Sequence, residues 1–199
     1  MSRLTSDEDP DFLAMARLKA GEDLALNEIM DRWTPRIHAF LLRSLNNPDD
    51  ARDLTQETFV AVYASRLRYR PSAKFSTWLF GIAANLARER IRWRTRHPEV
   101  ALALEKEAMQ APPGEDELYQ ETPATLIETA ERNAAVRDAI ESLPWSMRQL
   151  VILSQYEKLP QAEISAIAGC SIKAVETRLY RARKILSDRL RTFFEKEGQ

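Results

Sequence analysis

The chain has 199 residues, which is enough for one sizeable hydrophobic core or two small ones. Its 44% hydrophobic and 30% charged residues are typical of a water-soluble globular protein. No apolar run approaches the about 20 residues that a membrane-spanning helix needs, and the acidic N-terminus lacks the apolar segment of a secretory signal. The single cysteine, Cys170, excludes an internal disulfide and a cysteine-based metal site. We therefore expect a cytoplasmic protein that has no membrane insertion and needs no metal or cofactor.

The net charge of -1 hides a strong partition of charge along the chain. Residues 66–96 carry nine basic side chains against Glu89 alone, and residues 99–131 carry nine acidic side chains against Lys106 alone. Residues 173–191 are basic again, with seven Lys and Arg against two acids. Two basic blocks on either side of an acidic block indicate two surfaces that bind polyanions, joined by a segment that repels them.

The first part of the chain has the periodicity of helices. Glycine is scarce, with 5 in the whole chain, and no stretch alternates in the manner of a strand, so we expect an all-α protein. Apolar residues recur at three-and-four spacing over 26–45, which predicts an amphipathic helix that Pro35 kinks or divides in two. The sequence NNPDD at 46–50 ends this helix and starts the next, because Pro48 and two aspartates suit a first helical turn.

A loop and a third long helix complete the first domain. The sequence RYRPSAK at 68–74 predicts the loop, and Ser76 or Thr77 can cap the helix that follows it. These helices predict one small helical domain over residues 11–97, preceded by an N-terminal tail of residues 1–10.

The helical periodicity is lost after residue 97 and resumes near residue 126. Residues 98–125 contain APPGEDE and a further proline, so we expect a flexible acidic linker, either irregular or with one short helix over 99–109. A second small helical domain is expected over 126–195. It has a helix break at SLPWSM, residues 142–147, and a last helix over about 173–194.

The most specific local pattern lies at residues 159–186, which read LPQAEISAIAGCSIKAVETRLYRARKIL. A helix over 161–168 can end at Gly169 in the left-handed conformation, and Ser171 can cap the helix that follows. This is the spacing of a helix-turn-helix, whose second helix enters the major groove of DNA. The apolar side chains expected to meet across the turn are Ile164, Ala168, Ile172 and Val175.

The second helix of this motif offers an exposed face that can reach base edges and phosphates. Its candidate side chains are Lys173, Glu176, Thr177, Tyr180, Arg181 and Lys184, flanked by Arg178 and Arg183. The alternative to a DNA-binding unit is an ordinary helical hairpin with one basic face.

The first domain ends in a stretch where rings precede arginines, FSTWLFGIAANLARERIRWRTR at 75–96. Helical geometry stacks Arg88, Arg92 and Arg96 in one row, where like charges repel one another unless a phosphate backbone lies beside them. Rings beside such a row can stack on unpaired bases, so the stretch predicts a site for single-stranded nucleic acid. We expect Phe80 to pack in the core and Phe75, next to the loop, to be exposed.

Several motifs occur in a fixed order: DDARDLTQETFVAVY, KFSTWLFGIAANLARERIR, SLPWSMRQLVIL and the helix-turn-helix. Together they resemble a bacterial RNA polymerase sigma factor of the extracytoplasmic-function subfamily, over nearly the whole chain apart from the linker and the termini. The resemblance implies two helical domains, a promoter-opening region 2 domain and a helix-turn-helix region 4 domain, on either side of the linker.

The resemblance also implies roles for particular residues. The helix at 49–63 matches the surface for core polymerase, with Asp53, Leu54, Gln56, Glu57 and Phe59. The loop and helix at 72–96 match the part that holds the minus-ten DNA strand and captures a flipped base, with Lys74, Phe75, Asn85, Arg88 and Arg92. The second helix of the helix-turn-helix matches the reader of the minus-thirty-five element, with Lys173, Glu176, Thr177, Arg178, Tyr180 and Arg181. Glu176 departs from the basic residue often found there, and as an acceptor it can select a cytosine amino group.

The partners implied by the resemblance are promoter DNA, an anti-sigma factor and core RNA polymerase, through the clamp helices of its largest subunit and the flap of the second largest. The alternative is a stand-alone helix-turn-helix regulator, which has no need for the 49–63 helix or the loop of rings and arginines. An enzyme is not expected, because His38 and His97 lie far apart in sequence and the chain has no phosphate-binding glycine loop or nucleophile motif.

Overall fold

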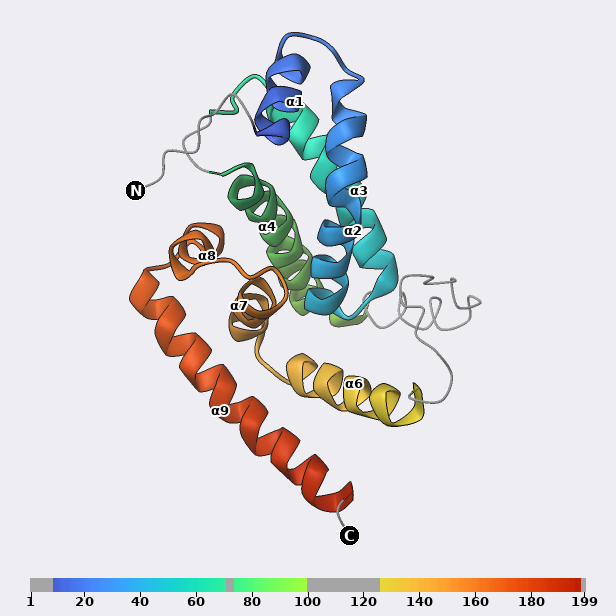
Figure 1. Ribbon diagram of the computed structural model, residues 1–199, viewed down its shortest axis with the longest axis vertical. Coiled ribbons are helices and arrows are strands. Elements are labelled where there is room, and N and C mark those ends of the chain that lie inside the picture. The colour runs from blue at the N-terminus through green and yellow to red at the C-terminus, as the bar shows by residue number, and fades with distance from the viewer. Residues whose placement is uncertain (1–8, 71–73, 100–125, 198–199) are drawn as a thin grey trace.

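The computed structural model of the chain describes residues 9–70, 74–99 and 126–197, and within these ranges every regular element is a helix (Figure 1). The all-α prediction is therefore confirmed. The short helix considered over 99–109 and nearly all of the linker lie outside the described residues.

Four helices form the first domain: α1 (Pro10–Lys19), α2 (Ala25–Leu45), α3 (Pro48–Ser65) and α4 (Phe75–Arg96). Asn46 ends α2 in the left-handed conformation, and the Asn47 side chain caps α3 by accepting from the Asp50 N–H at 2.8 Å. α2 runs through Pro35 as one helix, so of the two alternatives predicted for this proline, a kink or a division, the division is wrong. Buried Trp33 and Ile37 lie on either side of Pro35 and hold both halves of α2 against one core.

Helix α4 begins one residue earlier than the expected caps. Neither Ser76 nor Thr77 caps it; Lys74 occupies the capping position without a side-chain hydrogen bond, and the helix starts at Phe75. The reason is burial: the Phe75 ring lies inside the domain and anchors the first helical turn. The Thr77 hydroxyl donates instead to Glu163 of the second domain, at 3.0 Å.

Aromatic rings join α4 to α2. Phe80 of α4 meets Phe40 and Trp33 of α2 edge-on, with ring centroids 5.3 and 6.1 Å apart. Phe75 lies 5.9 Å from the Trp33 ring. Tyr69, just before the loop, lies 4.7 Å from the Trp78 ring and completes the group. Such contacts add directional preference to the burial of large apolar surfaces, so this aromatic cluster holds the start of α4 in one position.

The second domain contains α6 (Leu126–Glu141), α7 (Trp145–Gln155), α8 (Gln161–Ala168) and α9 (Ile172–Glu197). The helix-turn-helix is confirmed: Gly169 adopts a φ of 64°, and the Ser171 hydroxyl caps α9 by accepting from the Ala174 N–H at 3.2 Å. Ile164 and Val175 are buried between the helices as expected. Ile172 is exposed, because the first turn of α9 lies beyond the end of α8, so its predicted core role is wrong.

The two domains pack against each other. α8 lies on α4 and α7 lies on α2, while α9 runs along the outside of the second domain (Figure 1). The Arg36 guanidinium of α2 pairs with Glu157 at 2.8 Å, and Arg148 of α7 donates to the Ser44 carbonyl at 3.1 Å. The contact between domains therefore includes charged and polar pairs, and the buried apolar residues of the two domains form one continuous hydrophobic cluster.

The aromatic cluster should dominate the stability of the first domain. Replacing the fully buried Phe80 by Ala should lower the free energy of unfolding by about 3–5 kcal/mol, through lost burial and the cavity left behind. The measurement is urea unfolding followed by circular dichroism. Val60→Ala is the matched control, because Val60 is 68% exposed and the change should cost less than about 0.5 kcal/mol. Equal losses in the two variants would contradict this account of the core.

Candidate nucleic-acid interface

The first turns of α9 separate into two faces. Val175, Leu179 and Ala182 are buried against the rest of the second domain. The opposite face presents five of the six residues proposed to read the minus-thirty-five element: Lys173, Glu176, Thr177, Tyr180 and Arg181. The sixth, Arg178, is half-buried at the edge. The structure thus brings these side chains together on one exposed helical surface, as a major-groove reader requires.

Two of these side chains already interact. The Lys173 ammonium pairs with the Glu176 carboxylate at 3.2 Å, one turn along the helix. The Thr177 hydroxyl donates to the Lys173 carbonyl at 2.9 Å. Both interactions are exposed, so they can exchange for contacts with a base edge or a phosphate at little cost.

The loop before α4 differs from the sequence expectation at Phe75. The ring is 2% exposed and cannot form an outer wall of a base pocket without unfolding the first turn of α4, so the prediction of an exposed Phe75 is wrong. Phe80 is fully buried as expected, and Trp78 is half-buried. Lys74 and Asn85 are exposed, and Asn85 accepts a hydrogen bond from the half-buried Arg88 at 2.7 Å.

Tyr69, on the other side of the loop, is also fixed by burial. Burial raises the pKa of the Tyr69 hydroxyl, and the carboxylates of Asp9 and Asp11 raise it further. The phenol therefore stays neutral at physiological pH. It supports the start of α4 as an uncharged ring beside Phe75 and Trp78.

The arginines of α4 fall into two rows with different surroundings. Arg90 and Arg94 turn toward α3 and both pair with the buried carboxylate of Asp50, Arg94 at 2.8 Å. Arg90 also lies 3.5 Å from Glu57. The other row keeps Arg92 and Arg96 exposed. Asp50 and Glu57 thus offset the charge of this row and leave the other row for an external anion.

Sequence reasoning missed this role of Asp50. It treated the aspartate only as a favourable residue in the first turn of α3. The available signal was the row formed by Arg90 and Arg94, one helical turn apart, which needs a carboxylate if it faces the core.

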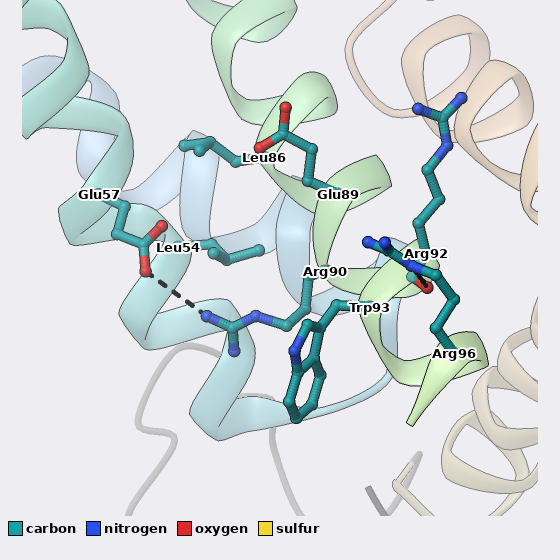
Figure 2. Close-up of a pocket in the computed structure, with 8 residues that line it drawn as sticks. All are labelled: Leu54, Glu57, Leu86, Glu89, Arg90, Arg92, Trp93 and Arg96. Atoms are coloured by element: carbon teal, nitrogen blue, oxygen red, sulfur yellow. Dashed lines mark hydrogen bonds and ion pairs between the residues drawn. The ribbon is translucent and has the colours of Figure 1, made fainter. Parts of the chain in front are cut away.

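An open pocket of ≈ 410 Å³ lies between α3 and α4 (Figure 2). Glu57 reaches toward Arg90 across it, and Trp93 closes one side. The Trp93 ring stacks on His97 with centroids 5.0 Å apart. The pocket joins the acidic edge of α3 to the basic edge of α4, and it is lined by Leu54, Glu57, Leu86, Glu89, Arg90, Arg92, Trp93 and Arg96.

The proposed polymerase-binding residues of α3 do not all share a surface. Asp53, Gln56 and Glu57 are exposed along one edge of the helix. Leu54 is 1% and Phe59 is 3% exposed, because both face the core beneath α3, so their assignment to a docking surface is corrected. The exposed apolar residue that the sequence reading passed over is Val60, one turn after Gln56.

In the described ranges, no group of three or more His, Cys, Asp and Glu side chains is placed to hold a metal ion. Over the same ranges, no helix combines the length and apolar character needed to cross a membrane.

Comparison with known proteins connects these surfaces to a family. The sequence model of Sigma-70 region 2 matches residues 29–97, and that of Sigma-70 region 4 matches residues 133–186. The RNA polymerase sigma factor CarQ of Myxococcus xanthus is 33% identical over 176 residues, which are 88% of this chain and 95% of that protein. The ECF RNA polymerase sigma factor SigW of Bacillus subtilis is 28% identical over 88% of this chain and 94% of its own length.

Solved structures give the same result for the fold. CnrH, solved in complex with the cytosolic domain of CnrY, has a TM-score of 0.63 at 26% identity, over 92% of this chain and 99% of that chain. The Bartonella quintana sigma factor RpoE, solved with the anti-sigma factor NepR, also has a TM-score of 0.63, at 21% identity over 84% of this chain and 98% of that chain. The matched regions include α3 and α4 in the first domain and α8 in the second. They also include the exposed face of α9 that carries Lys173, Glu176, Thr177, Tyr180 and Arg181, the proposed reading face. The chain belongs to the extracytoplasmic-function (ECF) sigma factors, the subunits that direct RNA polymerase to its promoters.

Proposed function

We propose that this sigma factor divides promoter recognition among three surfaces: the α3 edge, the start and exposed arginine row of α4, and the reading face of α9. The observation that carries this division is the sorting of exposed charge. The α3 edge is acidic, whereas the other two surfaces present cations and hydrogen-bonding groups. Opposite charge suits different partners, because only the cationic surfaces attract phosphates.

The α3 edge binds core polymerase through Asp53, Gln56, Glu57 and Val60. These residues combine two carboxylates, an amide and an exposed apolar side chain, which is the mixed composition of a protein interface. The second domain does not pack extensively on α3 in the described structure, so this edge is available to a partner.

The start of α4 and its exposed row hold the minus-ten element. Arg92 and Arg96 supply phosphate attraction, which acts equally on duplex and single strand. Lys74 lies exposed at the start of the same helix, one turn before the half-buried Trp78, and Asn85 is exposed in the middle of that helix. Contacts to an extruded base there stabilise only the opened promoter, and they offset a few kcal/mol of unstacking.

The reading face of α9 recognises the minus-thirty-five duplex. Thr177 and Arg181 are placed to reach base edges, and Glu176 can accept from a cytosine amino group. Two solved relatives, CnrH and Bartonella RpoE, have structures in complex with partner proteins. We extend this to the present chain: an anti-sigma protein controls it in the cytoplasm.

The α3 assignment predicts a loss of polymerase affinity on charge reversal. Asp53→Lys combined with Glu57→Lys should weaken binding to core polymerase by about tenfold or more, because both charges lie at the proposed interface. Fluorescence anisotropy with labelled protein gives the affinity, and circular dichroism checks that the helices remain. Asp31→Lys, an exposed reversal on α2, serves as control and should change little. Equal affinity of all variants would remove α3 from the interface.

The α9 assignment predicts a loss of sequence discrimination. Thr177→Ala and Arg181→Ala should each reduce the preference of the holoenzyme for its upstream element by about 1–3 kcal/mol per base contact removed. Competition binding among promoters that differ only in that element measures the preference. Arg191→Ala, an exposed change farther along α9, should leave the preference unchanged. A uniform loss on every upstream sequence would show that Thr177 and Arg181 contact phosphates only.

The α4 assignment predicts a defect in promoter opening. Lys74→Ala with Asn85→Ala should reduce open-complex formation by about tenfold and affect closed-complex affinity less, since a base pocket acts only on the open state. Permanganate reactivity of unpaired thymines reports opening, and Lys19→Ala, exposed on α1, is the control. A template already unpaired across the minus-ten element should recover most of the activity. If the unpaired template gives no recovery, these residues bind duplex DNA instead.

A further inference from the structure

We propose that the first turn of α4, with Lys74 and Thr77, is a binding site for a DNA phosphate, and that Glu163 of the second domain occupies this site in the free chain. The carboxylate of Glu163 stands where a phosphate of the minus-ten strand binds. This inference rests on the proposed role of α4 in holding that strand. It adds a competitor for DNA that is part of the same chain.

The contact uses both oxygens of Glu163. The Lys74 ammonium lies 2.7 Å from Oε1, and the Thr77 hydroxyl donates to Oε2 at 3.0 Å. The Glu163 side chain is 15% exposed, whereas that of Lys74 is 55% exposed. An anion is therefore already bound at this site, held by one cation and one hydroxyl and largely shielded from water.

The chemistry of the site suits a phosphate. The two groups that bind the carboxylate, Lys74 and Thr77, belong to the capping position and first turn of α4, where the helix dipole favours an anion and no side chain of α4 provides a cap. A cation, a hydroxyl donor and a helix N-terminus form a common set of phosphate ligands. Lys74 is also proposed to border the pocket for the extruded base, so the phosphate that this site binds is one beside that base in the minus-ten strand.

Glu163 has a second reason to be where it is, because it lies in the first turn of α8 and favours that helix end. That role explains why an acidic residue stands at this position of α8, but not why its carboxylate contacts α4. A carboxylate serving only α8 needs no partner, whereas Glu163 binds two groups of another domain that are 86 or more residues away in sequence. The contact therefore belongs to the interface between domains.

The contact is incompatible with a fully engaged promoter. Elements at minus ten and minus thirty-five lie about 85 Å apart along B-form DNA, at about 3.4 Å per base pair. From Glu163 to Arg181 the chain runs through α8, a turn and the start of α9, which reach at most about 35 Å. With Glu163 on Lys74, the reading face of α9 cannot reach its element while α4 holds the other. Promoter binding must separate Glu163 from Lys74.

Polymerase can bind before this separation. α3 packs on α2 and α4, and the second domain packs on α4 and α2 from α8, α7 and α6. The α3 edge therefore stays accessible while the phosphate site is occupied. Docking on polymerase therefore does not require release of Glu163, whereas strand capture at this site does.

The first experiment tests the contact without DNA or polymerase. A carbodiimide joins a lysine amine to a carboxylate only when the two are in contact, so it should link Lys74 to Glu163 in the free full-length chain, as identified by peptide mass spectrometry. An oligothymidylate of about 12 nucleotides, in the size range of small single-strand sites, should reduce the yield of this link. Absence of the link would overturn the proposal.

The second experiment tests the competition. Glu163→Gln should raise the affinity of the free chain for the same oligonucleotide by about tenfold, and should steepen the salt dependence by about 0.7 in the log–log slope, because one more phosphate is bound. Asp188→Asn is the control for net charge: it also removes one negative charge of the second domain, at an exposed pair within α9, and should change affinity less than about twofold.

A double-mutant cycle identifies the site. Lys74→Gln should reduce oligonucleotide affinity by less than about twofold in the parent chain, where Glu163 holds the lysine, and by about fivefold or more in the Glu163→Gln chain. Equal effects in both backgrounds, or no gain from Glu163→Gln, would overturn the phosphate site even if the cross-link forms. These measurements use no polymerase, so their failure is distinct from failure of the promoter-opening and polymerase-binding predictions.

Discussion

The position of α4 depends on the aromatic cluster between α2 and the start of that helix. Trp33 and Phe40 present their rings to Phe75 and Phe80, and this packing sets both the rotation and the starting point of α4. Everything proposed for minus-ten DNA follows from that rotation. With Phe75 inside, Lys74 must lie at the rim, and the arginines later in the helix must divide between an inner and an outer row.

Electrostatics then decides which of the arginines are available. The sequence has an unbroken alternation from Arg88 to Arg96, yet Asp50 binds Arg90 and Arg94 from the start of α3. A carboxylate that is nearly buried is stabilised by two guanidiniums, and their attraction for phosphate is reduced in turn. Net charge counted along a sequence therefore overstates the charge that a surface offers to DNA, and Arg92 and Arg96 are a better measure of it.

Local patterns predicted the local structures well. The helix-turn-helix follows from Gly169, Ser171 and the spacing of Ile164 and Val175, all within a few residues of one another. The burial of Phe75, Leu54 and Phe59 was not predicted, since a helix with apolar residues on more than one face does not reveal which face meets the core. Contacts between domains could not be predicted from the sequence. Arg36 and Glu157, for example, are 121 residues apart, and no periodicity links them. Such pairs are determined by tertiary packing alone.

The packing of α8 on α4 has a consequence for the free protein in a cell. A genome presents about a million or more non-specific DNA sites. These sites bind any protein that has an exposed cationic groove, to an extent set by the affinity of the groove for phosphate. A chain whose strand-holding site is filled by its own Glu163 loses part of that affinity. If Glu163 fills this site as proposed, a smaller fraction of the free protein is held on non-specific DNA, and a larger fraction can dock on polymerase through the acidic edge of α3.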